Sequence, residues 1–226
     1  NNPINLDLWK YLWNASGGGA DSPDSSLSFT YSYLLDGTEY YQHIRGCRPT
    51  SGTLSVSRGM WEQTMTFVAK DITIPNTTDG NGGTPVYQST ETSSSPIVHS
   101  DGGADPFTYN SVAYGERSFS TTVTRNMAVM AVNGETDITY TKATDRSITF
   151  TADVFAGTTS SETALYTLYE SKDADAASYK FNSTGPITLT YANCVLTDYS
   201  YTHAAGSTDA LIESITARAE SVTDLS

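Results

Sequence analysis

The chain has 226 residues, of which 38% are hydrophobic and 11% aromatic, so it is long enough for one large or two small domains with a packed core. Its formal net charge is −13, and its 12 Lys and Arg residues are scattered, which argues against a protein that binds DNA through a basic patch. No apolar run is long enough to cross a membrane as a helix. Thr, Tyr and Val favour strands, so the composition predicts a mainly β fold.

The first third of the chain predicts one short helix followed by strands. Apolar residues at helical spacing predict one to two helical turns within 4–13. Alternating side chains predict a strand over 27–35, which the turn dipeptide Asp36-Gly37 connects to a second strand at 40–44. Two more strands are expected at 54–57 and 65–69.

Residues 76–106 have a different composition. They are rich in Gly, Ser, Thr, Asp and Pro and have almost no apolar periodicity. Two interpretations stay open: a flexible linker, or an arm that becomes ordered only against a neighbouring subunit.

The second half predicts two long strands, a helix and a final group of strands. Alternation predicts strands over 118–124 and 147–155, with a long loop over 126–146 between them. Thr159 and Glu162 form a capping box, which predicts a helix near 160–171. Further strands are expected at 178–181, 187–191, 195–201 and 211–219.

Two segments of the chain resemble each other. Cys47 aligns with Cys194, 147 positions later, and with one extra residue 66–70 aligns with 214–218. A duplication would give two copies of one supersecondary unit, although hairpins rich in Ser, Thr and Val also resemble each other by chance. This pattern predicts a first β unit within 1–75, shorter by its opening strands, a linker at 76–106, and a more complete β domain over 107–226.

Residues with catalytic or metal-binding chemistry do not form a recognisable motif. His43, His99 and His203 are far apart and have no metal-ligand spacing, and no nucleophile motif is present. We therefore expect no enzymatic activity, no metal and no cofactor. Cys47 and Cys194 form either one disulfide bond or two buried free thiols, and we favour the thiols.

The strand order of residues 117–222 resembles that of the tail tube proteins of long-tailed bacteriophages and related archaeal viruses. The segments 45–59 and 67–71, the strands at 118–126 and 147–155, and the closing 187–222 are similar to sequences of that family. The resemblance covers about three quarters of the chain and leaves out 76–106. It implies an antiparallel β-sandwich or half-open barrel with one flanking helix.

The resemblance also implies a function as a structural subunit of the virion tail. Strands of neighbouring subunits would close into an inner barrel, and stacked rings would form a tube around a tape-measure protein and later conduct DNA without binding it. One domain per chain implies a hexameric ring, and two domains imply a trimer with pseudo-sixfold symmetry.

The resemblance suggests two groups of site residues. Polar positions of the long strands would face the lumen: Thr122, Thr124, Thr149, Thr151 and Asp153. Apolar residues of the expected loop would contact other subunits, unless they continue a core strand: Met127, Val129, Met130 and Val132.

Two other functions stay open at this point. A cell-surface or carbohydrate-binding β-sandwich would present aromatic residues on one exposed face, and Tyr31, Tyr33, Tyr40 and Tyr41 are candidates for such a face. Another virion component, such as a tail terminator or a decoration protein, is the second alternative.

Overall fold

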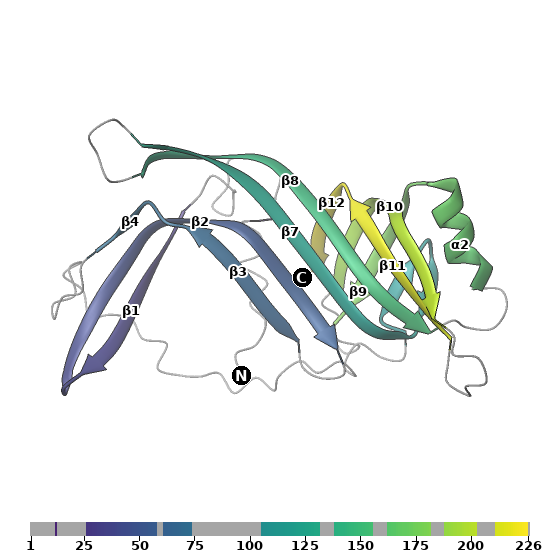
Figure 1. Cartoon of the computed structure of the whole chain (residues 1–226), viewed down its shortest axis with the longest axis horizontal. Coiled ribbons are helices and arrows are strands. Elements are labelled where there is room, and N and C mark those ends of the chain that lie inside the picture. Colours follow the sequence, from purple (N-terminus) through teal and green to yellow (C-terminus); the bar gives the residue numbers. More distant parts are fainter. Residues whose placement is uncertain are drawn as a thin grey trace.

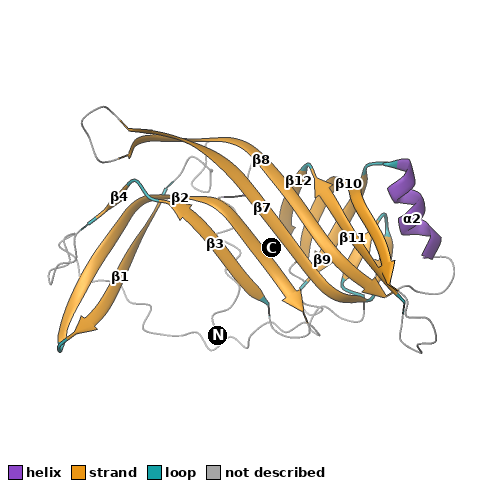
Figure 2. Ribbon diagram, in the orientation of Figure 1, coloured by secondary structure: helices purple, strands orange, loops and turns teal. Residues whose placement is uncertain are grey.

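The computed structural model describes residue 12 and residues 26–57, 61–73, 105–131, 138–155, 162–181, 188–202 and 211–225. Almost all of them lie in antiparallel strands, with α2 (Glu162–Ser171) on one side (Figures 1 and 2). In chain order the strands are β1 (Leu27–Leu35), β2 (Thr38–Ser57), β3 (Glu62–Val68), β4 (Asp71–Ile72), β5 (Phe107–Tyr109), β6 (Val112–Tyr114), β7 (Glu116–Ala131), β8 (Ile138–Phe155), β9 (Asp175–Lys180), β10 (Thr188–Thr202), β11 (Ile212–Ala219) and β12 (Ser221–Leu225).

The strands form one open sheet that folds into two layers. The first layer, which we call the inner layer, has the order β3-β2-β7-β8-β11-β10. The second layer contains β12, β10, β9, β5 and β6. Strands β2 and β10 belong to two parts of the sheet, because each pairs with different neighbours along its two halves. The first half of β2 pairs with β1 in a hairpin that projects from the two-layer body (Figure 1).

Aromatic side chains between the two layers form the centre of the core. Phe119 of β7 stacks on Tyr179 of β9 with ring centroids 4.3 Å apart, and Phe150 of β8 lies 4.9 Å from Tyr191 of β10. All four are buried, and Trp61 packs beside them against Tyr179 at 5.1 Å. Packing of aromatic side chains between two facing layers of sheet is typical of a β-sandwich, the fold that the sequence predicts.

Helix α2 covers the outer part of β10. Its Leu165 is fully buried, and Tyr169 stacks on Tyr199 of β10 at 6.0 Å. The ammonium group of Lys172 lies 3.4 Å from the centre of the Tyr169 ring, a cation–π contact at the end of the helix.

Several predicted elements are confirmed. The strand 27–35 and its Asp36-Gly37 turn are present, and both turn residues have positive φ (48° and 78°). The helix near 160–171 and the strands at 147–155 and 211–219 are also present. Leu12 is helical and buried, and its carbonyl oxygen accepts two hydrogen bonds from the Arg125 guanidinium, at 3.1 and 2.7 Å. The rest of 4–13, residues 76–104 and Thr159 lie outside the described residues.

Other predictions are wrong, mainly because the strands are longer than the sequence pattern predicts. The expected loop 126–146 is the far end of a long hairpin, in which β7 continues to Ala131 and β8 begins at Ile138. The strands predicted at 40–44 and 54–57 are parts of β2, and those at 187–191 and 195–201 are parts of β10. The sequence did not predict the short strands β5, β6 and β12.

An N-terminal set of strands (β1–β4) and a C-terminal set (β9–β12) share one hydrogen-bonding scheme. In each set a long strand has a residue with positive φ directly before a buried cysteine. Gly46 (φ 62°) precedes Cys47 in β2, and Asn193 (φ 51°) precedes Cys194 in β10. Gly46 also lies against Lys70, since a Cβ atom there would be 2.7 Å from the Lys70 Cβ.

The correspondence continues beyond the cysteines. Thr50 donates its hydroxyl hydrogen to the Thr66 carbonyl (3.3 Å), and Thr197 donates to the Thr216 carbonyl (3.2 Å). The strand register shifts at this point in both sets. Thr66 therefore corresponds to Thr216, and the sequence alignment of 66–70 with 214–218 is displaced by two residues.

Replacing the core residue Phe150 tests the packing of the two layers. We expect Phe150→Ala to lower the free energy of unfolding by about 3–5 kcal/mol, because the cavity opens beside Phe119 and Tyr191. Thr151→Ala, at the next and exposed position of β8, should change it by less than about 1 kcal/mol. Chemical denaturation measures both values, and equal losses would contradict the assignment of the two faces.

Candidate assembly site

The inner layer has one apolar face, which forms the core, and one face of Ser and Thr, which we call the polar face. On four adjacent strands the polar face consists of Ser51, Thr53 and Ser55 (β2), Ser118, Ser120, Thr122 and Thr124 (β7), Ser147, Thr149, Thr151 and Asp153 (β8), and Ser214, Thr216 and Arg218 (β11). Glu62, Thr64 and Thr66 of β3 extend it at one edge. These side chains are half-buried or exposed. On β2, β7, β8 and β11 the residues between them are buried, whereas Gln63 and Met65 of β3 are half-buried.

Hydroxyl groups connect the strands across the polar face. Thr53 lies opposite Thr122, which lies opposite Thr149, so three threonines form a row over β2, β7 and β8. The Thr53 and Thr122 hydroxyls share a hydrogen bond of 3.1 Å. Cross-strand pairs of this kind each stabilise a sheet by about 0.2–1 kcal/mol.

Asp153 holds three strands together at one end of the polar face. Ser118 of β7 donates a hydrogen bond to its Oδ2 at 2.8 Å, and Ser214 of β11 donates to its Oδ1 at 2.6 Å. Both partners lie directly opposite Asp153 in the strand register. The carboxylate therefore has neutral donors on both sides in the described structure.

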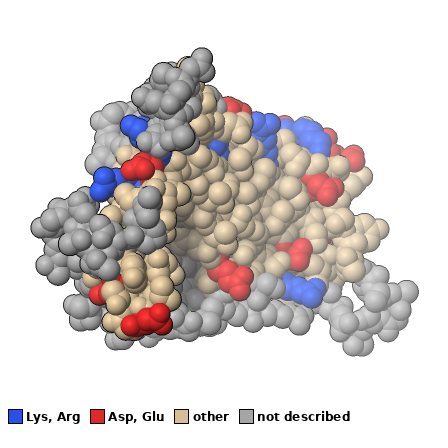
Figure 3. Space-filling model, turned by 60° about the vertical axis from the view of Figure 1, so that its left-hand side comes forward, with Lys and Arg blue, Asp and Glu red and all other residues tan. Residues whose placement is uncertain are grey.

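Charged residues are few on the polar face. Glu62 and Asp153 are acidic, and Arg218 is the basic residue among its described members. Figure 3 shows a face of the molecule on which Asp, Glu, Lys and Arg are sparse among uncharged residues. A surface of this kind offers hydroxyl groups to water and no cluster of cations to phosphate.

The structure brings the five residues predicted to face a lumen together on this surface. Thr122 and Thr124 lie on β7, and Thr149, Thr151 and Asp153 lie on β8. Two-residue alternation was sufficient to find them. The extension of the same face to β2, β3 and β11 was not predicted, because strand pairing between distant segments is not visible in the sequence.

Two edges of the inner layer have no neighbour among the described strands. Strand β3 pairs only with β2, and residues 195–202 of β10 pair only with β11. Backbone groups at such edges are ready to pair with another strand. As far as the described strands go, the inner layer is therefore an unclosed sheet with an edge on each side.

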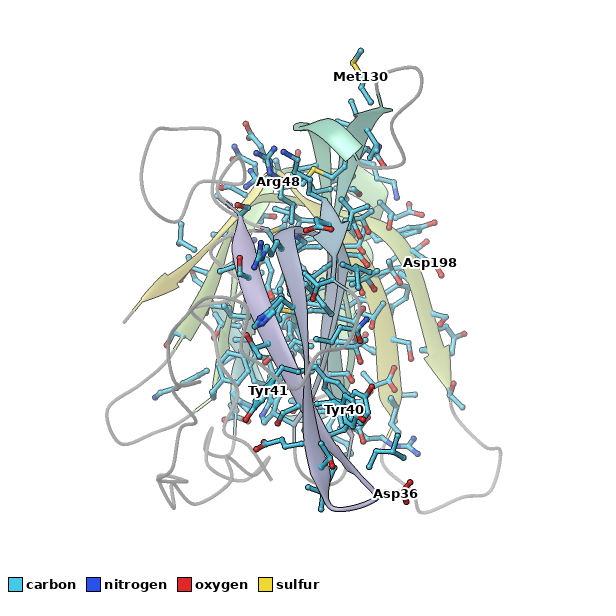
Figure 4. All side chains as sticks on the ribbon, turned by 90° about the vertical axis from the view of Figure 1, so that its left-hand side faces the viewer. Asp36, Tyr40, Tyr41, Arg48, Met130 and Asp198 are labelled. Carbon is cyan, nitrogen blue, oxygen red and sulfur yellow. The ribbon has the colours of Figure 1, made fainter. Side chains whose placement is uncertain are left out.

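The residues expected in an inter-subunit loop lie at the far end of the β7/β8 hairpin. Met127 is half-buried, whereas Val129 and Met130 are exposed, Met130 by 62%. Val132 lies outside the described residues. Figure 4 shows Met130 at the end of the molecule opposite to Asp36, the tip of the β1/β2 hairpin.

The β1/β2 hairpin carries a line of aromatic rings on one side. Tyr31 lies 5.9 Å from Tyr33, which stacks on Tyr40 at 5.8 Å, and Phe29 lies 5.1 Å from Phe67 of β3. We call Phe29, Tyr31, Tyr33, Tyr40 and Ile44 the aromatic face. Tyr41 is not part of it: Figure 4 shows Tyr40 and Tyr41 on different sides of the hairpin.

Both cysteines are free and buried. Burial raises the pKa of Cys47, and it raises the pKa of Cys194 to about 12. Within the described residues, no group of three or more His, Cys, Asp or Glu could hold a metal ion. No helix among them is long and apolar enough to cross a membrane.

Comparison with known proteins identifies a family. A family model described as phage tail tube protein matches residues 3–220. No curated protein matches the chain.

Several solved structures are similar over part of the fold. They include the PVC sheath-tube complex of an extracellular contractile injection system in the extended state (13% identity, 53% of this chain, 86% of that chain, TM-score 0.45). Hcp1 from Flavobacterium johnsoniae matches at 15% identity (52% and 91% of the two chains, TM-score 0.35), and the anti-feeding prophage baseplate at 16% (53% and 89%, TM-score 0.40). All three TM-scores are below 0.5, so the family assignment rests on the family model alone.

Burial of the thiols predicts that they resist chemical modification. At about pH 8 we expect the thiol reagent dithiobis(nitrobenzoate) to react with neither Cys47 nor Cys194 in the folded chain. The raised pKa keeps each thiol protonated, and burial keeps the reagent away from the sulfur atom. Unfolding in guanidinium should expose two reactive thiols. If both cysteines reacted with the reagent at the same rate with and without denaturant, that result would contradict their buried placement.

Proposed function

The chain belongs to the phage tail tube protein family, and we propose that its copies join at the edges of β3 and β10 into a ring whose polar face lines the lumen. Membership makes the chain a structural subunit of the virion tail. Nothing in the family match favours a carbohydrate-binding module or another virion component. We ascribe no catalytic step to the subunit.

The continuity of the polar face carries this proposal. Hydroxyl side chains run over β2, β7, β8 and β11 without a cluster of basic residues. The opposite face of these strands is the aromatic core, so the polar face is the side that remains wet when subunits meet. A lumen lined with neutral hydroxyls and scattered acids would let DNA pass without holding its phosphates.

Closure of the sheet between subunits explains why an open sheet is stable in the assembled state. The two edges that have no neighbour among the described strands would favour uncontrolled pairing in a free subunit, whereas a closed ring has no edges. The joint is heterologous, since the β3 side of one copy would face the β10 side of the next, and such contacts generate rings when the rotation closes.

The repeated hydrogen-bonding scheme supports two units in each chain. The first unit would lie within 1–75 and the second within 107–226, with 76–106 between them. Gly46-Cys47 in β2 and Asn193-Cys194 in β10 mark matching points of the two units. With two units per chain, a trimer would have pseudo-sixfold symmetry, and we prefer it to a hexamer. The tape-measure protein and then DNA would occupy the lumen.

The end of the β7/β8 hairpin is the proposed contact between stacked rings. Val129 and Met130 are exposed there although both are apolar, and Figure 4 shows Met130 at one extreme of the molecule. Burial of a large apolar side chain stabilises an interface by about 1.5–3 kcal/mol.

Electron microscopy of the purified chain tests the tube. We expect concentrated protein to form hollow tubes of uniform width, and threefold or sixfold averages to decide the ring order. Protein that stays monomeric under all conditions, including with the tape-measure protein present, would contradict the proposal.

Cysteine labelling in these tubes tests which face lies inside. In Thr151→Cys tubes, a large polyethylene-glycol maleimide should react at least about tenfold more slowly than in the unassembled subunit, because the polar face is enclosed. Ala176→Cys, on an exposed position of β9 in the second layer, should keep its reactivity. The buried native thiols contribute little background. Loss of labelling at Ala176 with full labelling at Thr151 would place the polar face outside.

Substitution at the hairpin end tests ring stacking. We expect Met130→Ser to leave the free energy of unfolding unchanged within about 0.5 kcal/mol, since the side chain is exposed, but to shorten the tubes or stop them at single rings. Val112→Ser, another exposed apolar position on β6, is the matched control and should form tubes of normal length. Electron microscopy measures tube length, and normal Met130→Ser tubes would refute the contact.

A further inference from the structure

The outer end of the β1/β2 hairpin is both acidic and apolar. Residues 34–39, which we call the hairpin tip, are exposed throughout. Asp36 and Glu39 carry negative charge there, and no Lys or Arg occurs in the sequence of the hairpin from residue 26 to residue 44. Leu34 and Leu35 are exposed by 73% and 55%. The hairpin tip therefore offers a partner two carboxylates and two large apolar side chains.

The corner where β2 meets β3 and β4 has the opposite charge. The backbone N–H of Lys70 donates to the Arg45 carbonyl at 3.0 Å, and Gly46 lies directly against the Lys70 side chain. Arg48 follows on β2. We call Arg45, Arg48 and Lys70 the basic corner. Asp71 lies opposite Arg45 at the same corner, so cations outnumber acids there.

The two surfaces lie toward opposite ends of the molecule. Figure 4 shows Asp36 at one end, Met130 at the other, and Arg48 in the half that Met130 occupies. In Figure 3, Lys and Arg gather near the upper end of the left-hand side, and Asp and Glu lie at its lower end. The end that carries the basic corner thus also carries the exposed side chain of Met130.

Stacking of rings brings opposite ends of the subunit together. In the proposed tube each ring follows the next along the axis in the same direction, so the contact is heterologous, with one end of a subunit against the other end of a subunit in the next ring. The surface that meets the end of the β7/β8 hairpin therefore belongs to the end that carries the hairpin tip. Opposite charges attract across such a contact, and apolar side chains on both sides lose water.

We propose that the hairpin tip of one subunit docks on the basic corner and the adjoining end of the β7/β8 hairpin of a second copy of this chain, in the neighbouring ring. Asp36 and Glu39 face the cations of the corner, and the leucines of the tip contact Met130. The contact is directional, because two tips or two basic corners repel each other. This inference rests on the proposed function and names the counter-surface of its ring-to-ring contact.

Reversal of one charge on each surface tests the contact. Sedimentation of the tubes leaves unassembled protein in solution, and its concentration is the critical concentration for tube growth. We expect Lys70→Glu to raise this concentration at least about tenfold, because an acid at the corner repels the hairpin tip. Glutamate suits this backbone position, since Glu220 makes the equivalent hydrogen bond in the C-terminal set, from its N–H to the Ala192 carbonyl at 3.1 Å.

Asp36→Lys is the matching change on the hairpin tip and should raise the critical concentration by a similar factor. Asp36 has a φ of 48°, and Lys172 shows that lysine adopts such a conformation in this chain, at 59°. Asp173→Lys is the control: it changes the net charge by the same amount at an exposed position just after α2, and should alter the critical concentration less than about twofold. Circular dichroism confirms that each variant is folded.

The double variant, Lys70→Glu with Asp36→Lys, restores opposite charges across the contact. Its critical concentration should therefore return to within about threefold of the parent value. Growth of the parent tubes should also weaken as the salt concentration rises, since salt screens exposed charges.

The possible results separate this contact from the proposed function. If the parent chain forms tubes and both single variants grow as it does, the docking of the hairpin tip is overturned and the tube remains. A double variant no better than the single variants, or an equal loss in Asp173→Lys, would also overturn the docking. A parent chain that forms neither rings nor tubes would overturn both proposals.

Discussion

Two-residue alternation along the strands of the inner layer is the constraint on which the rest of the molecule depends. In β8 the buried residues Ile148, Phe150 and Ala152 alternate with the polar Thr149 and Thr151. Because the side-chain period of a strand is two, a shift of one residue would move every aromatic ring to the polar face. The core therefore fixes the register, and the register places the hydroxyls of β2, β7, β8 and β11 on a common surface.

Strands β2 and β10 connect the inner layer to the rest of the fold at one repeated point. A left-handed residue before a buried cysteine turns each strand out of the inner layer, and in β2 only glycine fits, because Lys70 lies where its Cβ would be. The continuation of β10 joins the second layer and is covered. The continuation of β2 enters the projecting hairpin. The same local feature, a left-handed residue before a buried cysteine, thus precedes a covered core in the C-terminal half of the chain and an exposed face in the N-terminal half.

The sequence predicted those features that depend on local pattern. Alternation located the strand 27–35 and the polar residues of β7 and β8, and a capping box located the helix that follows them. Prediction failed where strands pass through irregular points: Gly46 and Asn193 look like turn residues, so β2 and β10 were each divided into two strands. The far end of the β7/β8 hairpin contains polar and charged residues, and because such residues are typical of loops, the sequence predicted a loop there. Pairing of β2 with β7 joins segments about seventy residues apart, and no local signal reports such contacts.

The contrast between the two strand sets has a thermodynamic consequence. Tyr179 and Tyr191 lose their water when the subunit folds, whereas Tyr31 and Tyr33 retain part of theirs. Burial of apolar surface stabilises a protein by about 25 cal/mol for each Å² removed from water. The N-terminal set therefore gains only part of this stabilisation when the subunit folds. Among the described strands, β3 likewise pairs with β2 on one side and has no neighbour on the other. If a neighbouring copy covers this face in the proposed tube, assembly would remove that remaining apolar area from water.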